Sequence, residues 1–134
     1  MEQAPLALGT AVVTDAVGLA AGPVRVMIHA VIHPTLGAPA LIDSVRRVAP
    51  AIMGAAESER LHTLAMPVLG VETTTASGEE ERFIAALVDE IVGALRRTER
   101  RIDRIVIVCR YQNQQAIVAA ALNRARERAW TQHE

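Results

Sequence analysis

The loop at residues 70–78 is the part of this sequence whose residue types and spacing are best suited to chemistry. It begins at Gly70, carries three threonines and a serine, and ends at Gly78. An apolar run precedes it at residues 61–69, and an acidic stretch at residues 79–81 opens an amphipathic segment. A glycine loop between a strand and a helix N-terminus presents backbone N–H groups to an anion. The pattern therefore predicts a site for a phosphate or diphosphate group.

The same loop has a purely structural interpretation. Ser77 or Gly78 is suited to cap the helix that follows, and the glutamates at residues 79–81 complement its dipole. Those carboxylates compete with a bound anion for the positive end of the helix. Glu72 would place a further negative charge beside a diphosphate, which is unfavourable. The sequence leaves both interpretations open.

Other polar side chains follow two predicted strands. His33 comes after the apolar run at residues 24–32, and Tyr111 and Asn113 come after the run at residues 104–109. Ligands of open α/β sheets bind outside the carboxyl ends of the strands. We therefore expect these three side chains at the ligand edge; the alternative for Tyr111 is a loop residue that covers the helix start. His29, inside the first of these runs, is expected to be a core histidine bonded to a backbone carbonyl.

Composition excludes several classes of function. The formal net charge is −1 and aromatic residues make up 2% of the chain, so neither a nucleic acid nor a membrane surface is an expected partner. No apolar run reaches membrane-spanning length. The basic residues are all arginine, which excludes lysine chemistry. Cys109 is the single cysteine and lacks a recognisable base, so we expect an inert thiol. With one cysteine we also expect a cytoplasmic location. No metal site and no cofactor are expected.

The elements that must position these residues alternate along the chain. Strands are predicted at residues 6–14, 24–32, 61–69 and 104–109, and helices at residues 40–57, 79–97 and 113–128. The run at 24–32 is nearly all apolar, which predicts a central strand buried on both faces. Pro50 is expected to kink or divide its helix. We predict one domain over residues 1–134, with a core at 6–128 and a tail at 129–134, and a three-layer α/β/α fold with a mixed sheet.

The order of these segments resembles the macro domain, the α/β fold that binds ADP-ribose. Residues 9–14 (GTAVVT) resemble the family's G-x-A-x-x-T strand, and residues 26–31 (VMIHAV) resemble its V-I-H-A-V strand. Residues 64–70 (LAMPVLG) resemble the I-A-F-P-A-L-G strand that leads into a phosphate loop, and residues 101–108 resemble the last strand. The family's earlier strands and first ligand loop have no counterpart, so the resemblance implies an N-terminally shortened member.

The resemblance implies a binding module for ADP-ribose or a related phosphorylated nucleotide. Recognition without turnover is expected, because the sequence assembles no acid–base pair or nucleophile. An aromatic residue near position 111 stacks on the adenine or ribose in that family, which assigns this role to Tyr111, with a hydrogen bond from Asn113. The residues expected to bind the ligand are His33, Gly70, Val71, Thr73, Thr74, Ser77, Gly78, Tyr111 and Asn113.

Two other hypotheses follow from the departures from the family. Where the family has the glycines of a G-T-G sequence, this chain has Gly70, Val71 and Glu72. A degenerate macro-like protein that acts through oligomerisation or partner binding, with no nucleotide ligand, is the alternative. Missing strands would leave apolar faces and an edge, so a homo-oligomer is expected. Hydrolysis of an ADP-ribose derivative is the least supported hypothesis, because no acid–base pair or nucleophile can be assembled from the sequence.

Overall fold

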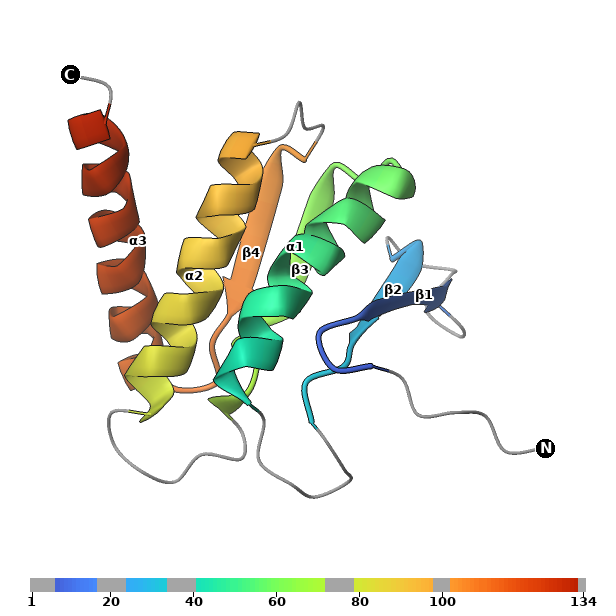
Figure 1. The fold of residues 1–134 in the computed structure, drawn as a ribbon, viewed down its shortest axis with the longest axis horizontal. Coiled ribbons are helices and arrows are strands. Elements are labelled where there is room, and N and C mark those ends of the chain that lie inside the picture. The colour runs from blue at the N-terminus through green and yellow to red at the C-terminus, as the bar shows by residue number, and fades with distance from the viewer. Residues whose placement is uncertain (1–6, 17–23, 34–40, 72–78, 98–101, 133–134) are drawn as a thin grey trace.

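Strands and helices alternate in the computed structural model, which describes residues 7–16, 24–33, 41–71, 79–97 and 102–132. The order is β1 (Ala11–Asp15), β2 (Val26–Ala30), α1 (Ile42–Ser58), β3 (Thr63–Pro67), α2 (Glu79–Arg97), β4 (Arg104–Val108) and α3 (Gln112–Gln132) (Figure 1). The predicted α/β class is confirmed. The bounds of α2 are those predicted from its apolar stripe and acidic first turn.

The strands form two hydrogen-bonded pairs. β1 and β2 are antiparallel, with Ala11 opposite Ala30, and β3 and β4 are parallel, with Thr63 opposite Arg104. The parallel pair needs the crossover that α2 provides. Parallel and antiparallel pairing are therefore both present, as predicted, but over the described residues they occur in two separate pairs, β1–β2 and β3–β4.

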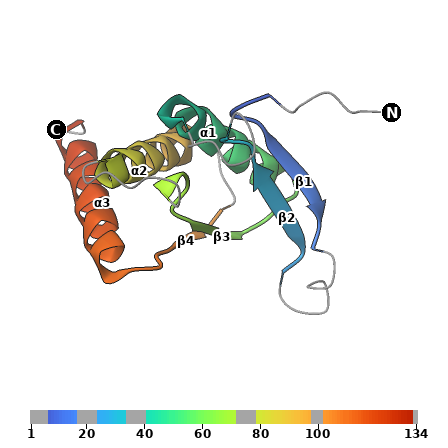
Figure 2. The same ribbon diagram turned by 90° about the horizontal axis from the view of Figure 1, so that it is seen from below.

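The described helices α1, α2 and α3 lie on one side of the β3–β4 pair (Figure 2). Side chains of β3 alternate accordingly. Leu64 and Met66 point to the helices and pack in the core, whereas Ala65 and Pro67 are exposed on the other face. The described helices thus form one outer layer of the predicted three-layer arrangement, and the strands form the layer beneath it.

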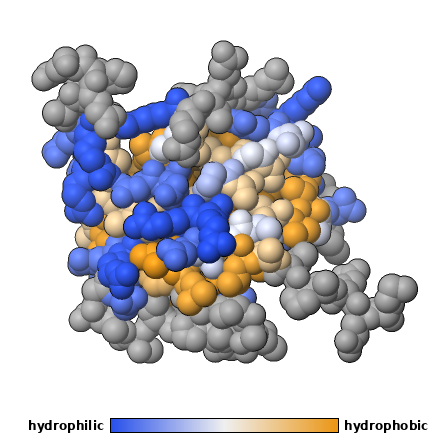
Figure 3. Space-filling view, in the orientation of Figure 1, coloured by the Kyte–Doolittle hydropathy of each residue, from blue (hydrophilic) through white to orange (hydrophobic). Residues whose placement is uncertain are grey.

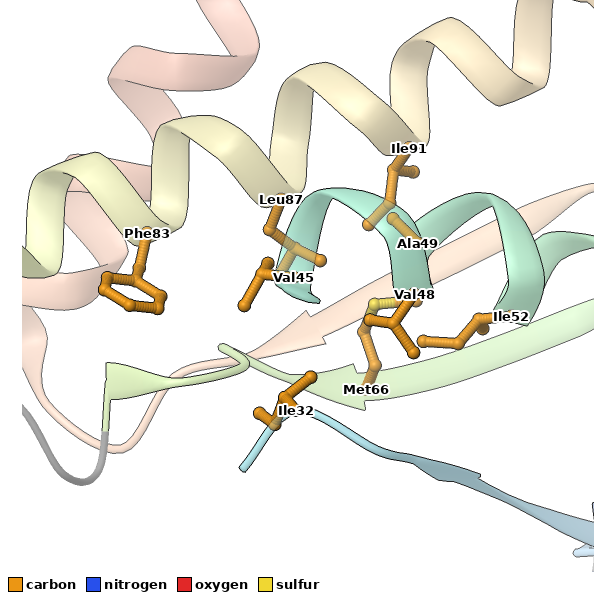
Figure 4. Close-up of a cluster of buried hydrophobic side chains, with 9 residues drawn as sticks. All are labelled: Ile32, Val45, Val48, Ala49, Ile52, Met66, Phe83, Leu87 and Ile91. Atoms are coloured by element: carbon orange, nitrogen blue, oxygen red, sulfur yellow. The ribbon is translucent and has the colours of Figure 1, made fainter. Parts of the chain in front are cut away.

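The main core lies where α1 and α2 cross the strands. Val45, Val48 and Ile52 of α1 meet Phe83, Leu87 and Ile91 of α2, and Met66 and Ile32 reach them from the strand side (Figure 4). A second cluster lies under α3, where Val118 and Ala121 pack against Ile84 and Val88. Full burial of one leucine or isoleucine contributes about 1.5–3 kcal/mol, so these clusters stabilise the helix layer.

The structure corrects three predictions about the elements. β1 is shorter than predicted because the chain turns at Gly9, whose φ is +84°. The prediction that β2 is buried on both faces is wrong: its residues alternate between half-buried and exposed, because the described helices cover one face. α1 continues through Pro50, so the proline does not divide the helix, and a kink there stays a prediction.

Candidate functional site

The carboxyl ends of β2, β3 and β4 and the N-termini of α1, α2 and α3 lie at one edge of the molecule, the lower edge in Figure 1. This arrangement follows from the strand–helix alternation, since each helix returns the chain to the opposite edge. Helix N-termini carry a partial positive charge and outward N–H groups. The ligand edge, defined here as residues 68–71, 79–82 and 109–114 together with His33, is therefore the place in the fold best suited to an anion.

Gly70 lies in the turn that follows β3 and is required by the backbone and by the core. Its φ is +89°, and a Cβ atom on it would stand 2.6 Å from Cδ1 of Phe83. Gly70 is buried, and the side chain of Val71 packs against both core clusters. The fold therefore also explains why a glycine stands at this position of the predicted phosphate loop.

A hydrogen-bond network joins the beginnings of α2 and α3. Nε2 of Gln114 donates to Oε1 of Glu80 at 2.8 Å, and Nδ2 of Asn113 donates to Oε2 of Glu80 at 3.3 Å. On its other side, Oε1 of Gln114 accepts from the backbone N–H of Arg110 at 2.9 Å and of Tyr111 at 3.3 Å. Gln114 is 6% exposed, so this network is held against water and fixes the turn between β4 and α3.

Tyr111 stands at the turn that Gln114 holds. Its side chain is 55% exposed, and the guanidinium carbon of Arg110 lies 5.5 Å from the ring centroid. An exposed ring on a fixed backbone offers a face on which a base or ribose can stack. Arg110 places a positive charge over the ring, which suits a phosphorylated ligand.

The described residues thus bring together four of the predicted site residues, Gly70, Val71, Tyr111 and Asn113, at the ends of β3 and β4. Four others, Thr73, Thr74, Ser77 and Gly78, lie outside the described residues. His33 is half-buried on the chain that leaves β2. The first turn of α2 remains acidic: Glu79 pairs with Arg82 at 2.7 Å and Glu80 holds the amides of Asn113 and Gln114.

The prediction for His29 is wrong. The side chain is exposed on β2, and its Nε2 lies 2.8 Å from the hydroxyl oxygen of Thr14 on β1. The two residues are diagonal neighbours across the antiparallel pair, because Thr14 is opposite Met27. His29 therefore belongs to the outer face of β1–β2 and not to the core.

Sequence reasoning missed Gln114 and the role of Glu80. Gln114 is the third residue of α3, the position from which a glutamine in a capping box reaches back to the backbone of the cap. That spacing was available as a signal. The pattern is incomplete, however, because the residue at the cap, Tyr111, is not one of the usual capping types.

A hollow of about 380 Å³ lies away from the ligand edge. It opens between α2, α3 and the beginning of β4, and its lining is mainly aliphatic, including Leu95, Ile102 and Leu122. Among the described residues no group of three or more histidine, cysteine, aspartate or glutamate side chains could hold a metal ion. None of the helices that the structure describes is long and apolar enough to cross a membrane.

Comparison with known proteins gives a fold but no close relative. No family model and no protein of curated function matches the sequence. Solved structures of the Oceanobacillus iheyensis macrodomain do match. A point mutant of it has a TM-score of 0.72 and 16% identity, over 92% of this chain. A second mutant, solved with ADPR, has a TM-score of 0.66 and 15% identity, and a form solved with ADP has a TM-score of 0.67 and 15% identity.

This chain spans 62% of the length of each of those macrodomain chains. The resemblance carried by the sequence motifs is thus confirmed at the level of the fold. The chain has an α/β fold similar to that of macrodomains over the part of their length that it covers.

Proposed function

We propose that the ligand edge binds ADP-ribose or a related phosphorylated nucleotide, and that the protein recognises this ligand without turning it over. The observation that carries the proposal is the convergence of the end of β3, the N-terminus of α2 and the exposed ring of Tyr111 at one edge. Macrodomains of similar fold have been solved with ADPR and with ADP, which supports the same ligand class.

Each part of the ligand has a suitable group at this edge. The phosphates suit the N-terminus of α2 and the loop that leads into it from Gly70. The base or the ribose suits the face of Tyr111, and Asn113 follows two residues later in the first turn of α3. His33, Thr73, Thr74, Ser77 and Gly78 remain proposed ligand contacts from the sequence.

The acidic first turn of α2 weakens phosphate binding. Glu79 and Glu80 stand at the helix end that would face a diphosphate, although Arg82 and the amides of Asn113 and Gln114 contact their carboxylates. We therefore expect an affinity lower than a glycine-rich phosphate loop would give. We propose recognition without turnover because no acid–base pair or nucleophile can be assembled from the sequence.

Calorimetry with ADP-ribose tests the proposal. The chain is expected to give a saturable heat with one site. Tyr111→Ala should weaken binding at least about tenfold, a loss typical of one stacked base. Tyr111→Phe should keep most of the affinity, because the ring is retained. Leu122→Ala is the matched control, since this side chain is also exposed on α3 but far from its N-terminus. Absence of heat at millimolar ADP-ribose would remove the proposal.

The alternative is a macro-like protein that acts through a partner or an oligomer without a nucleotide. The position of the aliphatic hollow between α2, α3 and β4, away from the ligand edge, favours it. So does Gly70, because its φ of +89° and its close approach to Phe83 explain the glycine without a ligand. Light scattering distinguishes this hypothesis: it predicts a mass above one chain at micromolar concentration together with no heat from ADP-ribose.

A further inference from the structure

Three consecutive glutamates open α2 at the ligand edge, and they differ in what holds them. Glu79 pairs with Arg82, with 2.7 Å between Oε1 and Nη1, so a cation offsets its charge. Glu81 is exposed and its carboxylate has no partner among the described residues, so it can turn toward water. Glu80 is half-buried and is bonded by side chains of α3. The three charges would therefore act differently on a ligand.

Glu80 is held in place by neutral groups. Its two carboxylate oxygens accept from Nδ2 of Asn113 and from Nε2 of Gln114, which are amide donors and carry no charge. Gln114 is itself fixed, because its Oε1 accepts from the backbone N–H groups of Arg110 and Tyr111. Within the described part of the chain, no arginine or histidine pairs with Glu80. A negative charge is therefore fixed at the N-terminus of α2 without a counter-ion.

The fixed charge of Glu80 is connected to both parts of the proposed ligand site. Glu80 stands in the first turn of α2, where the diphosphate is proposed to bind, and Gln114 joins it to the turn that carries Tyr111. In the view of Figure 3 the surface over α3 is mainly hydrophilic, so we expect charge to govern binding beside the Tyr111 ring. A partly buried charge is screened less by salt than an exposed one. Of the three glutamates, Glu80 is therefore the one expected to repel a phosphate most strongly.

We propose that Glu80 is the residue that sets the charge selectivity of the ligand edge, and that it penalises each phosphate charge a ligand brings there. This inference rests on the proposed function, because it concerns the same ligand and the same edge. A helix N-terminus that is left open favours an anion, whereas here a fixed carboxylate opposes it through like-charge repulsion. Among ligands that share the adenosine group, the penalty rises from AMP to ADP to ATP, and adenosine carries none.

Calorimetry of the parent chain and of Glu80→Gln with adenosine, AMP, ADP, ATP and ADP-ribose tests the proposal. Glutamine keeps the length of the side chain and an oxygen that can accept from Gln114, so the variant chiefly loses the charge. Its gain in affinity over the parent should be absent with adenosine, about threefold with ADP-ribose and at least about tenfold with ATP. Added salt should reduce the gain, because ions screen the repulsion.

Two matched variants remove one carboxylate charge elsewhere on α2. Glu90→Gln changes a residue far along the helix from the ligand edge, where Glu90 lies 3.9 Å from Nη1 of Arg46, and it should leave every affinity unchanged. Glu81→Gln should give a gain of about twofold or less with ATP, because the exposed carboxylate is hydrated and screened. Thermal unfolding of all three variants checks that each is folded.

The outcomes separate this inference from the proposed function. Glu80 would lose the assigned role if Glu80→Gln gave no gain with any ligand, or the same gain with adenosine as with ATP. A gain of the same size in Glu81→Gln would also overturn it, because the charge of the whole turn would then be the cause. In these three cases the nucleotide still binds and the proposed function stands. Absence of heat with every ligand, in the parent and in Glu80→Gln, would remove the proposed function and this inference with it.

Discussion

The side chain of Gln114 on α3 is bonded to the side chain of Glu80 on α2, with 2.8 Å between Nε2 and Oε1. The same glutamine accepts two backbone N–H groups from the turn that follows β4. One buried amide therefore ties the N-termini of two helices to the backbone of Tyr111. The proposed base-binding and phosphate-binding parts of the ligand edge are thus mechanically connected, although they lie 31 residues apart in the chain (from 80 to 111).

Removing this amide should destabilise the protein. Gln114→Ala removes a buried side chain and leaves two partly buried backbone donors without their acceptor, so we expect a loss of about 1–3 kcal/mol in the free energy of unfolding. Gln115→Ala is the control, because this neighbour is exposed and its replacement should change stability by less than about 0.5 kcal/mol. Urea denaturation measures both. Equal stability of the two variants would mean that the network contributes nothing.

The two glycines Gly70 and Gly54 should respond to alanine in opposite directions. Gly70 has a φ of +89° and faces the ring of Phe83, so Gly70→Ala should cost about 2–4 kcal/mol through strain and overpacking. Gly54 lies in α1 with nothing within 4 Å of a Cβ, so Gly54→Ala should stabilise the protein by about 0.5–1 kcal/mol. Thermal unfolding compares the two. A Gly70→Ala protein as stable as the parent would contradict the packing described here.

Leucines at two depths test the position of the core. Leu87 is fully buried between α1 and α2, and Leu87→Ala should cost about 2–5 kcal/mol. Leu122 on α3 is 44% exposed, and Leu122→Ala should cost clearly less, about 1 kcal/mol. Chemical denaturation with both variants checks the order. A larger loss at Leu122 would show that the hollow beside α3 is covered in solution.

The sequence predicts the helices better than the strands, for a physical reason. The stripe that includes Phe83, Leu87 and Ile91 repeats at helical spacing, and the acidic first turn marks the start of α2 without ambiguity. Burial of β2 depends instead on what lies beside it. Val26 to Ala30 are mostly apolar, yet every second residue is exposed, because the described neighbours cover one face and one edge.

The site was predictable in outline and not in its contacts. That ligands meet the carboxyl ends of strands follows from the α/β alternation, which places Gly70 and Tyr111 at one edge. The bonds from Asn113 and Gln114 to Glu80 join residues 33 and 34 positions apart. No local pattern encodes a pairing of that kind, because it depends on how α2 and α3 pack together.

A crystal structure of the chain soaked with ADP-ribose tests the central claim most directly. The account predicts density for the nucleotide at the ligand edge, with the diphosphate at the N-terminus of α2 and the base or ribose against the ring of Tyr111. Density in the aliphatic hollow between α2, α3 and β4, or an empty ligand edge at saturating nucleotide, would contradict it.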